Sequence, residues 1–199
     1  YVCGEENPAQ IALRIDRLKE NDYEQDNLVF ITSTNVDSII KAIKKIKPEV
    51  VVVDSIQTVT TFDLSGSAGS VGQVRECAER LTSTAKSLSI PMFLVGHVTK
   101  DGSLAGPKVL EHMIDCSLML EGSSDSHFRT LRSNKNRFGA VNELGVFAMT
   151  DKGLREVPNP SAIFLQRGEE VSSGSVVMVV WEGTRPLLVE LRALVDDSH

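Results

Sequence analysis

The stretch VVVVDSIQT, residues 50–58, decides the fold class. A continuous run of β-branched residues is typical of a strand buried on both faces of a parallel sheet. Asp54 stands where this strand ends. Because open α/β sheets bind their ligands at the carboxyl ends of the strands, the stretch predicts an α/β fold with a carboxylate at its ligand-binding edge.

The chain on either side alternates between strand and helix patterns. The apolar runs LVFIT (28–32) and MFLVG (92–96) predict two more strands. Residues 35–48 and 70–88 carry apolar side chains three and four positions apart, as amphipathic helices do.

Residues at both ends of the segment 35–48 also favour a helix. Thr34 or Asn35 can cap its start, and Pro48 follows its end. The order strand, helix, strand, helix, strand implies right-handed crossovers and a doubly wound α/β sheet.

Hairpin patterns replace this alternation in the second half of the chain. The runs 116–122 and 127–133 flank one polar turn, and the runs 145–150 and 154–157 flank another. We expect these strands to form an antiparallel extension that continues the sheet. The segment 174–194 has two strand-like halves around EGTRP, which predicts one more hairpin.

Composition excludes several classes of protein. The chain has 199 residues, of which 41% are hydrophobic, and a net charge of −6, which argues against a generally basic, histone-like binder. The cysteines, Cys3, Cys77 and Cys116, are odd in number and far apart, so they support neither a disulfide framework nor a metal site, and a reducing cytosol fits best. No signal peptide or membrane-spanning run is expected. Because the first residue is Tyr1, we expect a fragment of a longer protein.

Asp54 is the first candidate for chemistry. In phosphoryl-transfer sites an aspartate at such a strand end holds Mg²⁺, directly or through water. A structural role, in which Asp54 caps the following segment, is equally compatible with the pattern.

The opening residues YVCGEE (1–6) offer a second carboxylate. Glu5 follows a strand and a glycine, so it is expected at the same sheet edge as Asp54, where it could orient or deprotonate a water molecule. Glu6 competes for that role, and a solvated pair of loop carboxylates is the alternative.

The strand end VGHVTK (95–100) adds His97 and Thr99. Either side chain could contact a phosphate or relay contact to a ligand. A lone histidine is nevertheless more often structural.

Two loops follow strands at this edge. The segment 62–73 is small and polar but has no lysine to hold a phosphate, so it is not a phosphate loop. The segment 100–108 places Lys100 and Lys108 around two glycines, a composition suited to a mobile loop that touches a nucleic-acid backbone. An ordinary surface loop is the alternative.

A cationic segment runs from residue 126 to residue 142. It contains no Asp or Glu and four cations: Arg129, Arg132, Lys135 and Arg137. An arginine near a turn can reach a phosphate on a neighbouring molecule, and a cationic strand can bind a nucleic-acid backbone. A solvated edge strand, guarded by charge against aggregation, is the third interpretation.

The order of motifs resembles one family over essentially the whole chain. Six motifs of this chain resemble the bacterial RadA (Sms) family of DNA-repair ATPases, which belongs to the RecA superfamily. These motifs are YVCGEE (1–6), VVVVDSIQT (50–58), GSVGQVRE (69–76), FLVGHVTKDGSLAGPKVLEHMID (93–115), KNRFG (135–139) and NELGVFAMTDKGLREVPNPSAIFL (142–165). The KNRFG segment argues against another RecA-fold ATPase such as a KaiC-like protein.

This resemblance implies a fold and a domain order. It implies a RecA-like core over 1–157 with a mainly parallel sheet flanked by helices, a linker over 158–173, and the first hairpin of a truncated Lon-protease-like domain over 174–199. No Ser–Lys pair supports a peptidase activity of that last part.

It also implies the activity of the whole protein. RadA proteins use ATP and Mg²⁺ to move on single-stranded DNA as a helicase, and they promote branch migration of recombination intermediates during DNA repair and the response to DNA damage and stress. The implied partners are single-stranded and branched DNA, a RecA-type recombinase and further copies in a homo-hexamer. Zn²⁺ would bind only in a zinc finger that precedes residue 1.

Carried over residue by residue, the resemblance assigns roles at the sheet edge. It makes Glu5 the catalytic base, Asp54 the Walker B aspartate that supports Mg²⁺, and His97 a γ-phosphate sensor. The segments 62–73 and 100–108 match two DNA-facing loops.

The cations are expected to contact phosphate groups. Lys100 and Lys108 lie in one of these DNA-facing loops, and the acid-free cationic run predicts that Arg129 and Arg132 contact DNA as well. Lys135 and Arg137 lie in a signature that acts near nucleotide or DNA across a subunit boundary, and the sequence does not choose between these two phosphate groups.

The departures from the family pattern matter equally. The chain has no G-x-x-x-x-G-K-[ST] phosphate loop (Walker A) and no zinc-finger cysteines. We expect truncation as the reason, and we expect the chain by itself not to hydrolyse ATP. The alternative is a non-catalytic paralogue that lacks a phosphate loop and binds DNA or a recombinase.

Overall fold

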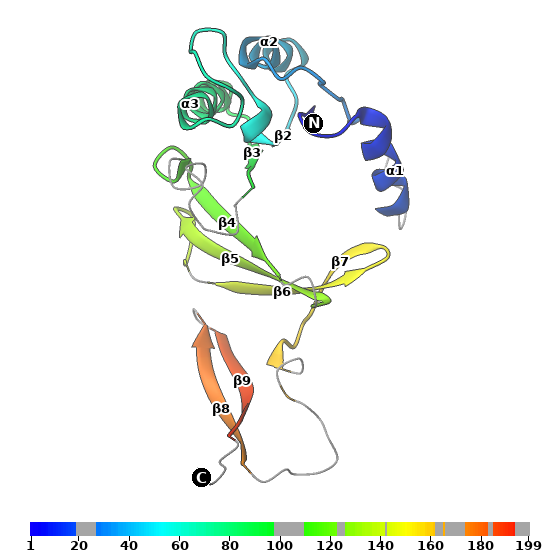
Figure 1. Cartoon of the computed structure of the whole chain (residues 1–199), viewed down its shortest axis with the longest axis vertical. Helices are drawn as coiled ribbons and strands as arrows, with labels where there is room; N and C mark the ends of the chain where they lie inside the picture. Colours follow the sequence, from blue (N-terminus) through cyan, green and yellow to red (C-terminus); the bar gives the residue numbers. More distant parts are fainter. Residues whose placement is uncertain are drawn as a thin grey trace, which may run out of the picture. The chain divides into compact units, whose positions relative to one another are not determined.

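The computed structural model describes most of the chain and divides it into two compact units. The described residues are 1–18, 27–97, 110–122, 126–141, 143–161, 165, 174–182 and 185–193 (Figure 1). The units span Tyr1–Ile114 and Asp115–His199, and each is considered by itself. The predicted boundaries at 157 and 173 stay a prediction, and most of the predicted linker lies outside the described residues.

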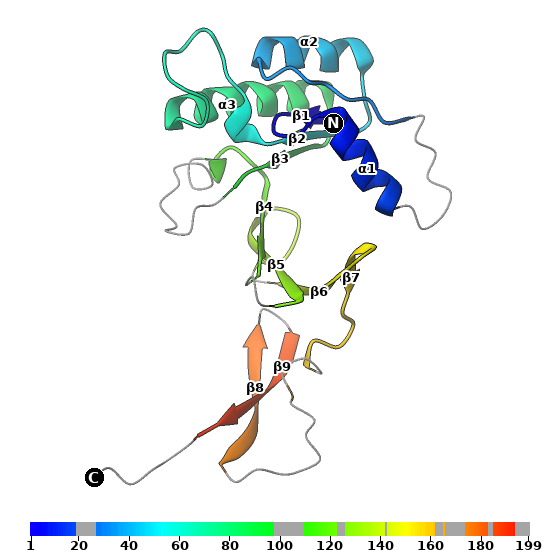
Figure 2. The same cartoon turned by 45° about the vertical axis from the view of Figure 1, so that its right-hand side comes forward.

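A parallel sheet forms the centre of the first unit. Strands β1 (Val2–Cys3), β2 (Val51–Asp54) and β3 (Met92–Val95) lie in the order β1-β2-β3 (Figure 2). The register pairs Cys3 with Asp54 and Asp54 with Val95. The α/β class and these strands are therefore as the sequence predicts.

The predicted strand at 28–32 is wrong in extent. Within this segment, only Ile31 forms a bridge, with Val2. The Cys3 amide donates to the Ile31 carbonyl at 2.8 Å, and the Ile31 amide donates to the Tyr1 carbonyl at 2.9 Å. The neighbouring strand β1 is only two residues long, so the bridge pairing does not extend beyond Ile31, and Leu28 and Val29 remain exposed.

Two helices cover one face of this sheet. Helices α2 (Val36–Ile46) and α3 (Val71–Leu88) lie side by side above the strands in Figure 2. A short 3-10 helix, η2 (Ile56–Thr58), follows β2. Asn35 is the cap of α2, since its Oδ1 accepts from the Ser38 amide at 3.0 Å.

Chain direction explains why both helices share a face. The connection through α2 leads from Ile31 past β1 to β2, and the connection through α3 leads from β2 to β3, so both cross the sheet in the same direction. Right-handed crossovers in one direction place their helices on the same face.

Helix α1 (Pro8–Leu18) belongs to a connection in the opposite direction. It follows β1 and leads back to the Ile31 side, so the right-handed rule assigns it to the other face. In both views α1 lies apart from α2 and α3 (Figures 1 and 2). The connections that leave β1 and β2 therefore diverge, and ligands of open α/β folds bind at such a divergence.

The sequence prediction missed α1, although its start carries a signal. Asn7 Oδ1 accepts from the Gln10 amide at 2.9 Å, and Gln10 Oε1 accepts from the Asn7 amide at 3.2 Å. This reciprocal pair is a capping box, and Pro8 occupies the first helical position, where proline is favoured.

One apolar core joins the sheet to α2 and α3. Its buried members include Val2, Val36, Ile39, Ile43, Val51, Val53, Ile56, Val74, Cys77, Ala78, Leu81 and Leu110. Alternate residues of β2, Val51 and Val53, point into this core, so Val52 and Asp54 face the other side of the sheet. Burial raises the pKa of the Cys77 thiol to about 11, so this cysteine is a packing residue.

Antiparallel strands make up the second unit. Strands β4 (Cys116–Glu121), β5 (Phe128–Asn136), β6 (Leu144–Thr150) and β7 (Gly153–Glu156) form one sheet in chain order. The predicted hairpins are confirmed, but the prediction that they continue the parallel sheet is wrong for the part of the chain that the structure describes. Short turns pair each strand with its neighbour in sequence, and β4 pairs with β5 alone.

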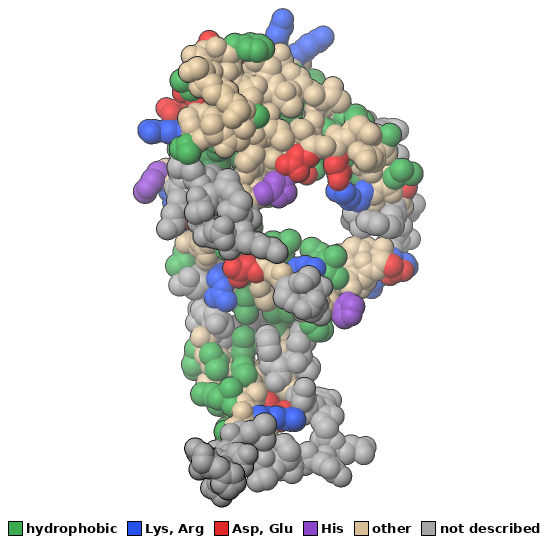
Figure 3. All heavy atoms as spheres, viewed as in Figure 1, with side chains coloured by type: hydrophobic (Ala, Val, Ile, Leu, Met, Phe, Trp, Pro, Cys, Tyr) green, Lys and Arg blue, Asp and Glu red, His purple; other side chains and the backbone are tan. Residues whose placement is uncertain are grey.

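The final hairpin is confirmed as well. Strands β8 (Ser175–Glu182) and β9 (Arg185–Arg192) pair along their whole length. Hydrophobic side chains of β8, from Val176 to Val179 together with Trp181, are exposed, and Figure 3 shows such side chains over β8. Leu187 of β9 is buried with Leu144 and Val146. The Lon-like identity of this hairpin stays a prediction.

No helix among the described residues combines the length and the apolar character that crossing a membrane requires.

Candidate active site

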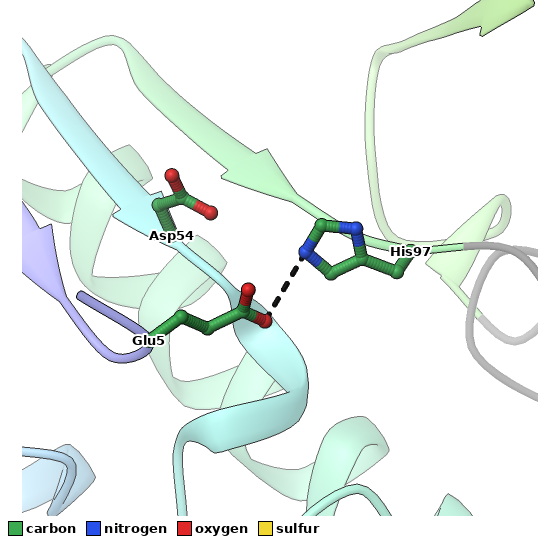
Figure 4. Close-up of side chains that lie close together, drawn as sticks. All are labelled: Glu5, Asp54 and His97. Atoms are coloured by element: carbon green, nitrogen blue, oxygen red, sulfur yellow. Dashed lines mark ion pairs between the residues drawn. The ribbon is translucent and has the colours of Figure 1, made fainter. Parts of the chain in front are cut away.

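Three polar side chains converge at the carboxyl ends of the parallel strands. Glu5 follows β1, Asp54 ends β2 and His97 follows β3, and Figure 4 shows their side chains directed toward one another. One ligand atom from each lies within 4.8 Å of the others. Glu5 Oε1 and His97 Nε2 are 3.1 Å apart. The structure thus brings together the three residues that the sequence places at this edge.

Gly4 allows Glu5 to reach this position. The Gly4 amide donates to the Asp54 carbonyl at 2.7 Å, which holds the end of β1 against the end of β2. A Cβ at residue 4 would lie 1.8 Å from Thr58 Oγ1 and 2.8 Å from Thr58 Cβ. Only glycine fits here without a shift of η2 or of the end of β1.

Ser55 fixes the Glu5 carboxylate. Its Oγ donates to Glu5 Oε1 at 2.6 Å, and the serine is completely buried. A buried hydroxyl that donates to a carboxylate oxygen restricts the orientation of the carboxylate. Sequence reasoning missed Ser55, although it directly follows the aspartate of VVVVDSIQT.

Glu6 is held elsewhere. Arg14 of α1 donates from Nη2 to Glu6 Oε1 at 2.6 Å. Of the two adjacent carboxylates, Glu5 therefore lies at the convergence of the strand ends and Glu6 pairs with α1.

Tyr1 contacts the other carboxylate of the site. Its phenol hydroxyl donates to Asp54 Oδ2. Burial, aided by this hydrogen bond, raises the pKa of Tyr1 above its ordinary value, so the hydroxyl keeps its proton and stays a donor. The Asp54–Ser55 peptide bond is cis. Sequence reasoning missed Tyr1 as well, because nothing in the pattern indicates the reach of its ring.

His97 lies at the solvent side of the site. Its side chain is 60% exposed and that of Glu5 40% exposed, so an ion pair between them would be modestly stabilising. The His97 carbonyl accepts from Gln57 Nε2 at 3.1 Å, which ties this strand end to η2. Thr99 and the lysines Lys100 and Lys108 lie outside the described residues.

The donor set fits a magnesium ion. The carboxylates of Asp54 and Glu5 supply hard oxygen ligands of the kind that Mg²⁺ prefers, whereas the His97 nitrogen is a poorer match for that ion. Asp54, directly or through water, is the residue that would hold the ion, with the Glu5 carboxylate beside it. When bound beside a nucleotide, Mg²⁺ neutralises charge on the phosphates. The sequence itself supplies no phosphate loop.

The predicted DNA-facing segment 62–73 is anchored at its start. Gln73 is buried; its Nε2 donates to the carbonyls of Thr61 at 3.1 Å and Leu64 at 2.8 Å, and its Oε1 accepts from the Thr61 amide at 2.8 Å. Between these anchored residues the Phe62 side chain is 91% exposed. The last residues of the segment form the first turn of α3.

Arg137 and Arg129 of the cationic segment have hydrogen-bond partners within the second unit. Arg137 Nη1 donates to Asp115 Oδ1 at 2.8 Å. Arg129 Nη1 donates to the carbonyls of Ser126 and Phe128 at 2.7 and 2.8 Å. Arg129, Arg132 and Lys135 lie on β5. Although the cationic segment contains no Asp or Glu, the fold brings Asp115 from outside the segment next to Arg137 and so supplies the opposite charge.

The KNRFG turn also presents an aromatic ring. Asn136 Oδ1 accepts from the Phe138 amide at 3.0 Å, and Asn136 Nδ2 donates to the Ala140 carbonyl at 3.2 Å. These bonds fix the turn, while the Phe138 side chain is 81% exposed. Sequence reasoning considered only the two cations of this motif.

Comparison with known proteins tests the resemblance. No family model matches the chain. The chain is 61% identical over 198 residues to DNA repair protein RadA of Haemophilus influenzae, which covers 100% of this chain and 43% of the relative. It is also 61% identical over 198 residues to DNA repair protein RadA of Escherichia coli K12, covering 100% of this chain and 42% of that protein. The chain thus spans less than half the length of these curated relatives.

A solved structure shows the same fold at low identity. A KaiC-like protein from the archaeon Pyrococcus horikoshii superimposes with a TM-score of 0.60 and 18% identity, covering 79% of this chain and 74% of that one. This likeness supports the predicted RecA-like fold alone. Together with identities of 61% over the whole chain, it confirms the resemblance seen in the motifs. The chain belongs to the RadA family of DNA repair proteins.

Proposed function

We propose that the chain carries the catalytic carboxylates of a DNA-dependent ATPase that acts in DNA repair. The observation that supports this proposal is the convergence of Glu5, Asp54 and His97 at the carboxyl ends of three parallel strands. Ligands of open α/β folds bind at this edge.

Each residue has a proposed role in hydrolysis. Glu5, held by Ser55, orients and deprotonates the attacking water. Asp54 supports Mg²⁺, and His97 senses the terminal phosphate from the solvent side. The phosphate loop would come from outside these 199 residues, because none of the three side chains can cradle a triphosphate.

The whole protein would couple hydrolysis to movement on DNA. The relatives named RadA are DNA repair proteins, and we propose for this chain the same role through helicase activity and branch migration. The proposed partners are single-stranded and branched DNA, a RecA-type recombinase and a homo-hexameric ring.

Hydrolysis by the full-length protein tests the proposal. We expect Mg²⁺-dependent release of phosphate from ATP, stimulated by single-stranded DNA and abolished by chelation of Mg²⁺. The 199-residue chain alone should show no robust hydrolysis. Salt-sensitive DNA binding by a full-length protein that does not hydrolyse ATP would instead favour a non-catalytic DNA-binding paralogue.

Arg137 is proposed to contact a phosphate group. Replacement by Gln in the full-length protein should lower the affinity for single-stranded DNA by roughly 3–10-fold and reduce the slope of log affinity against log salt by about 1. Fluorescence anisotropy at several salt concentrations measures both quantities.

A second arginine of the same unit controls for loss of an ion pair as such. Arg192 pairs with Glu190 at 3.0 Å in β9, and Arg192→Gln should leave the salt slope unchanged. If Arg137→Gln abolished hydrolysis with DNA affinity intact, Arg137 would act on nucleotide. An unchanged affinity, slope and hydrolysis rate would remove Arg137 from both roles.

A further inference from the structure

We propose that Tyr1 is a positioning residue that holds the Asp54 carboxylate in the orientation needed to bind a divalent cation. This inference rests on the proposed function and deepens it. It states that Tyr1, which is not one of the catalytic residues, positions the carboxylate that binds the metal.

The hydrogen bond leaves the carboxylate able to bind metal. Tyr1 donates its hydroxyl proton to Oδ2 of Asp54. A carboxylate oxygen carries two lone pairs, so Oδ1 and one lone pair of Oδ2 remain for an ion or its water. The phenol fixes rotation about the bond to the carboxyl group, which is otherwise a soft torsion.

Strand register explains how a residue before β1 reaches the end of β2. Val2 pairs with Val53, so Tyr1 is level with Val52, and the alternation of side chains puts Tyr1 on the same face as Val52 and Asp54. From there the long tyrosine side chain extends along the strand direction, far enough to reach Asp54, two residues beyond Val52. This face is the one opposite the core beneath α2 and α3.

Tyr1 is itself held in place. Its ring meets Phe30 edge-on, with ring centroids 6.3 Å apart and an interplanar angle of 66°. Its carbonyl accepts from the Ile31 amide at 2.9 Å. Backbone and ring are thus fixed by the same neighbouring segment, and the hydroxyl is presented to Asp54 at little further cost in conformational entropy.

Packing alone is the competing explanation for these contacts. Tyr1→Phe separates the two, since phenylalanine keeps the ring and its contact with Phe30 but has no hydroxyl to donate. Groups that hydrogen-bond to a metal ligand typically contribute about 10-fold or more to metal affinity, which sets the expected size of the effect.

The test uses the full-length protein with ATP and Mn²⁺ as the spectroscopic probe. Electron paramagnetic resonance should show roughly tenfold weaker Mn²⁺ binding for Tyr1→Phe than for wild type. The Mg²⁺ concentration for half-maximal hydrolysis should rise similarly, with the KM for ATP unchanged.

A double-mutant cycle with Asp54→Asn tests whether Tyr1 affects metal affinity through Asp54. Asp54→Asn keeps one amide oxygen as a weaker ligand, and in that background Tyr1→Phe should cause little further loss of Mn²⁺ affinity. Equal Mn²⁺ affinity of Tyr1→Phe and wild type, or the same loss in both backgrounds, would overturn the proposal. Failure of the proposed function is seen separately, as absence of hydrolysis by the wild-type protein.

Discussion

Replacing Glu5 by glutamine is expected to lower the kcat for ATP hydrolysis by the full-length protein by about 10²–10⁴-fold. Glutamine keeps the shape of the side chain and can still accept the hydrogen bond from Ser55, but its amide cannot take a proton from water. Since the change removes an effect on the chemical step, the KM for ATP should stay close to that of wild type. Steady-state kinetics at saturating Mg²⁺ and DNA measure both constants.

Glu6 provides the matched control for this substitution. It is the next residue in the chain and a carboxylate of the same kind, but it pairs with Arg14 of α1. Glu6→Gln should therefore leave kcat within about twofold of wild type, since an exposed pair of this kind contributes little. If the large loss followed Glu6→Gln and not Glu5→Gln, the assignment of the base would be wrong.

Gly4→Ala is expected to lower the free energy of unfolding of this chain by about 3 kcal/mol, at the upper end of the usual cost of overpacking. The added Cβ would meet Thr58 at 1.8 Å from Oγ1 and 2.8 Å from Cβ. Rotation of the threonine cannot relieve the second contact, so either η2 or the end of β1 must move. Urea denaturation followed by circular dichroism measures the change.

Gly72→Ala is the corresponding control. Gly72 lies in the first turn of α3, and a Cβ there would meet nothing within 4 Å. Both substitutions restrict the unfolded chain equally, so their difference isolates the clash. We expect Gly72→Ala to be neutral or to stabilise by up to about 1 kcal/mol. Equal stability of the two variants would show that the β1 end accommodates a side chain.

The sequence predicts the first unit well where burial dictates the pattern. The valines before Asp54 and the spacing within α2 and α3 reflect a core that those same residues form, so pattern and structure have one cause. The segment 28–32 looks equally apolar, but its neighbour β1 is only two residues long, so within the segment the bridge forms at Ile31 alone, beside one further bond from the Tyr1 amine to the Val29 carbonyl at 2.8 Å. The length of a neighbouring strand cannot be read from the composition of the segment itself.

Some residues of the candidate site could likewise be predicted from the sequence, and others could not. Glu5, Asp54 and His97 could be predicted because each stands at or just after the end of a strand, and parallel strands end at one edge of the sheet. Tyr1 and Ser55 could not, because their importance depends on which carboxylate each hydroxyl reaches in three dimensions. The pairing of Arg137 with Asp115 could not be predicted either, because 22 positions separate the two residues in the sequence.

The position of β1 has a consequence for how the site comes into being. This two-residue strand lies between Ile31 and β2, and both of its partners are distant in sequence. No local turn or helix can hold it before those partners have formed, because closing such loops costs entropy that only the finished pairing offsets. Glu5 therefore meets Asp54 only once β1 has paired with β2. A chain in which this pairing is missing would keep both carboxylates but hold them apart, so by the function proposed above its base and its metal-binding carboxylate could not act together.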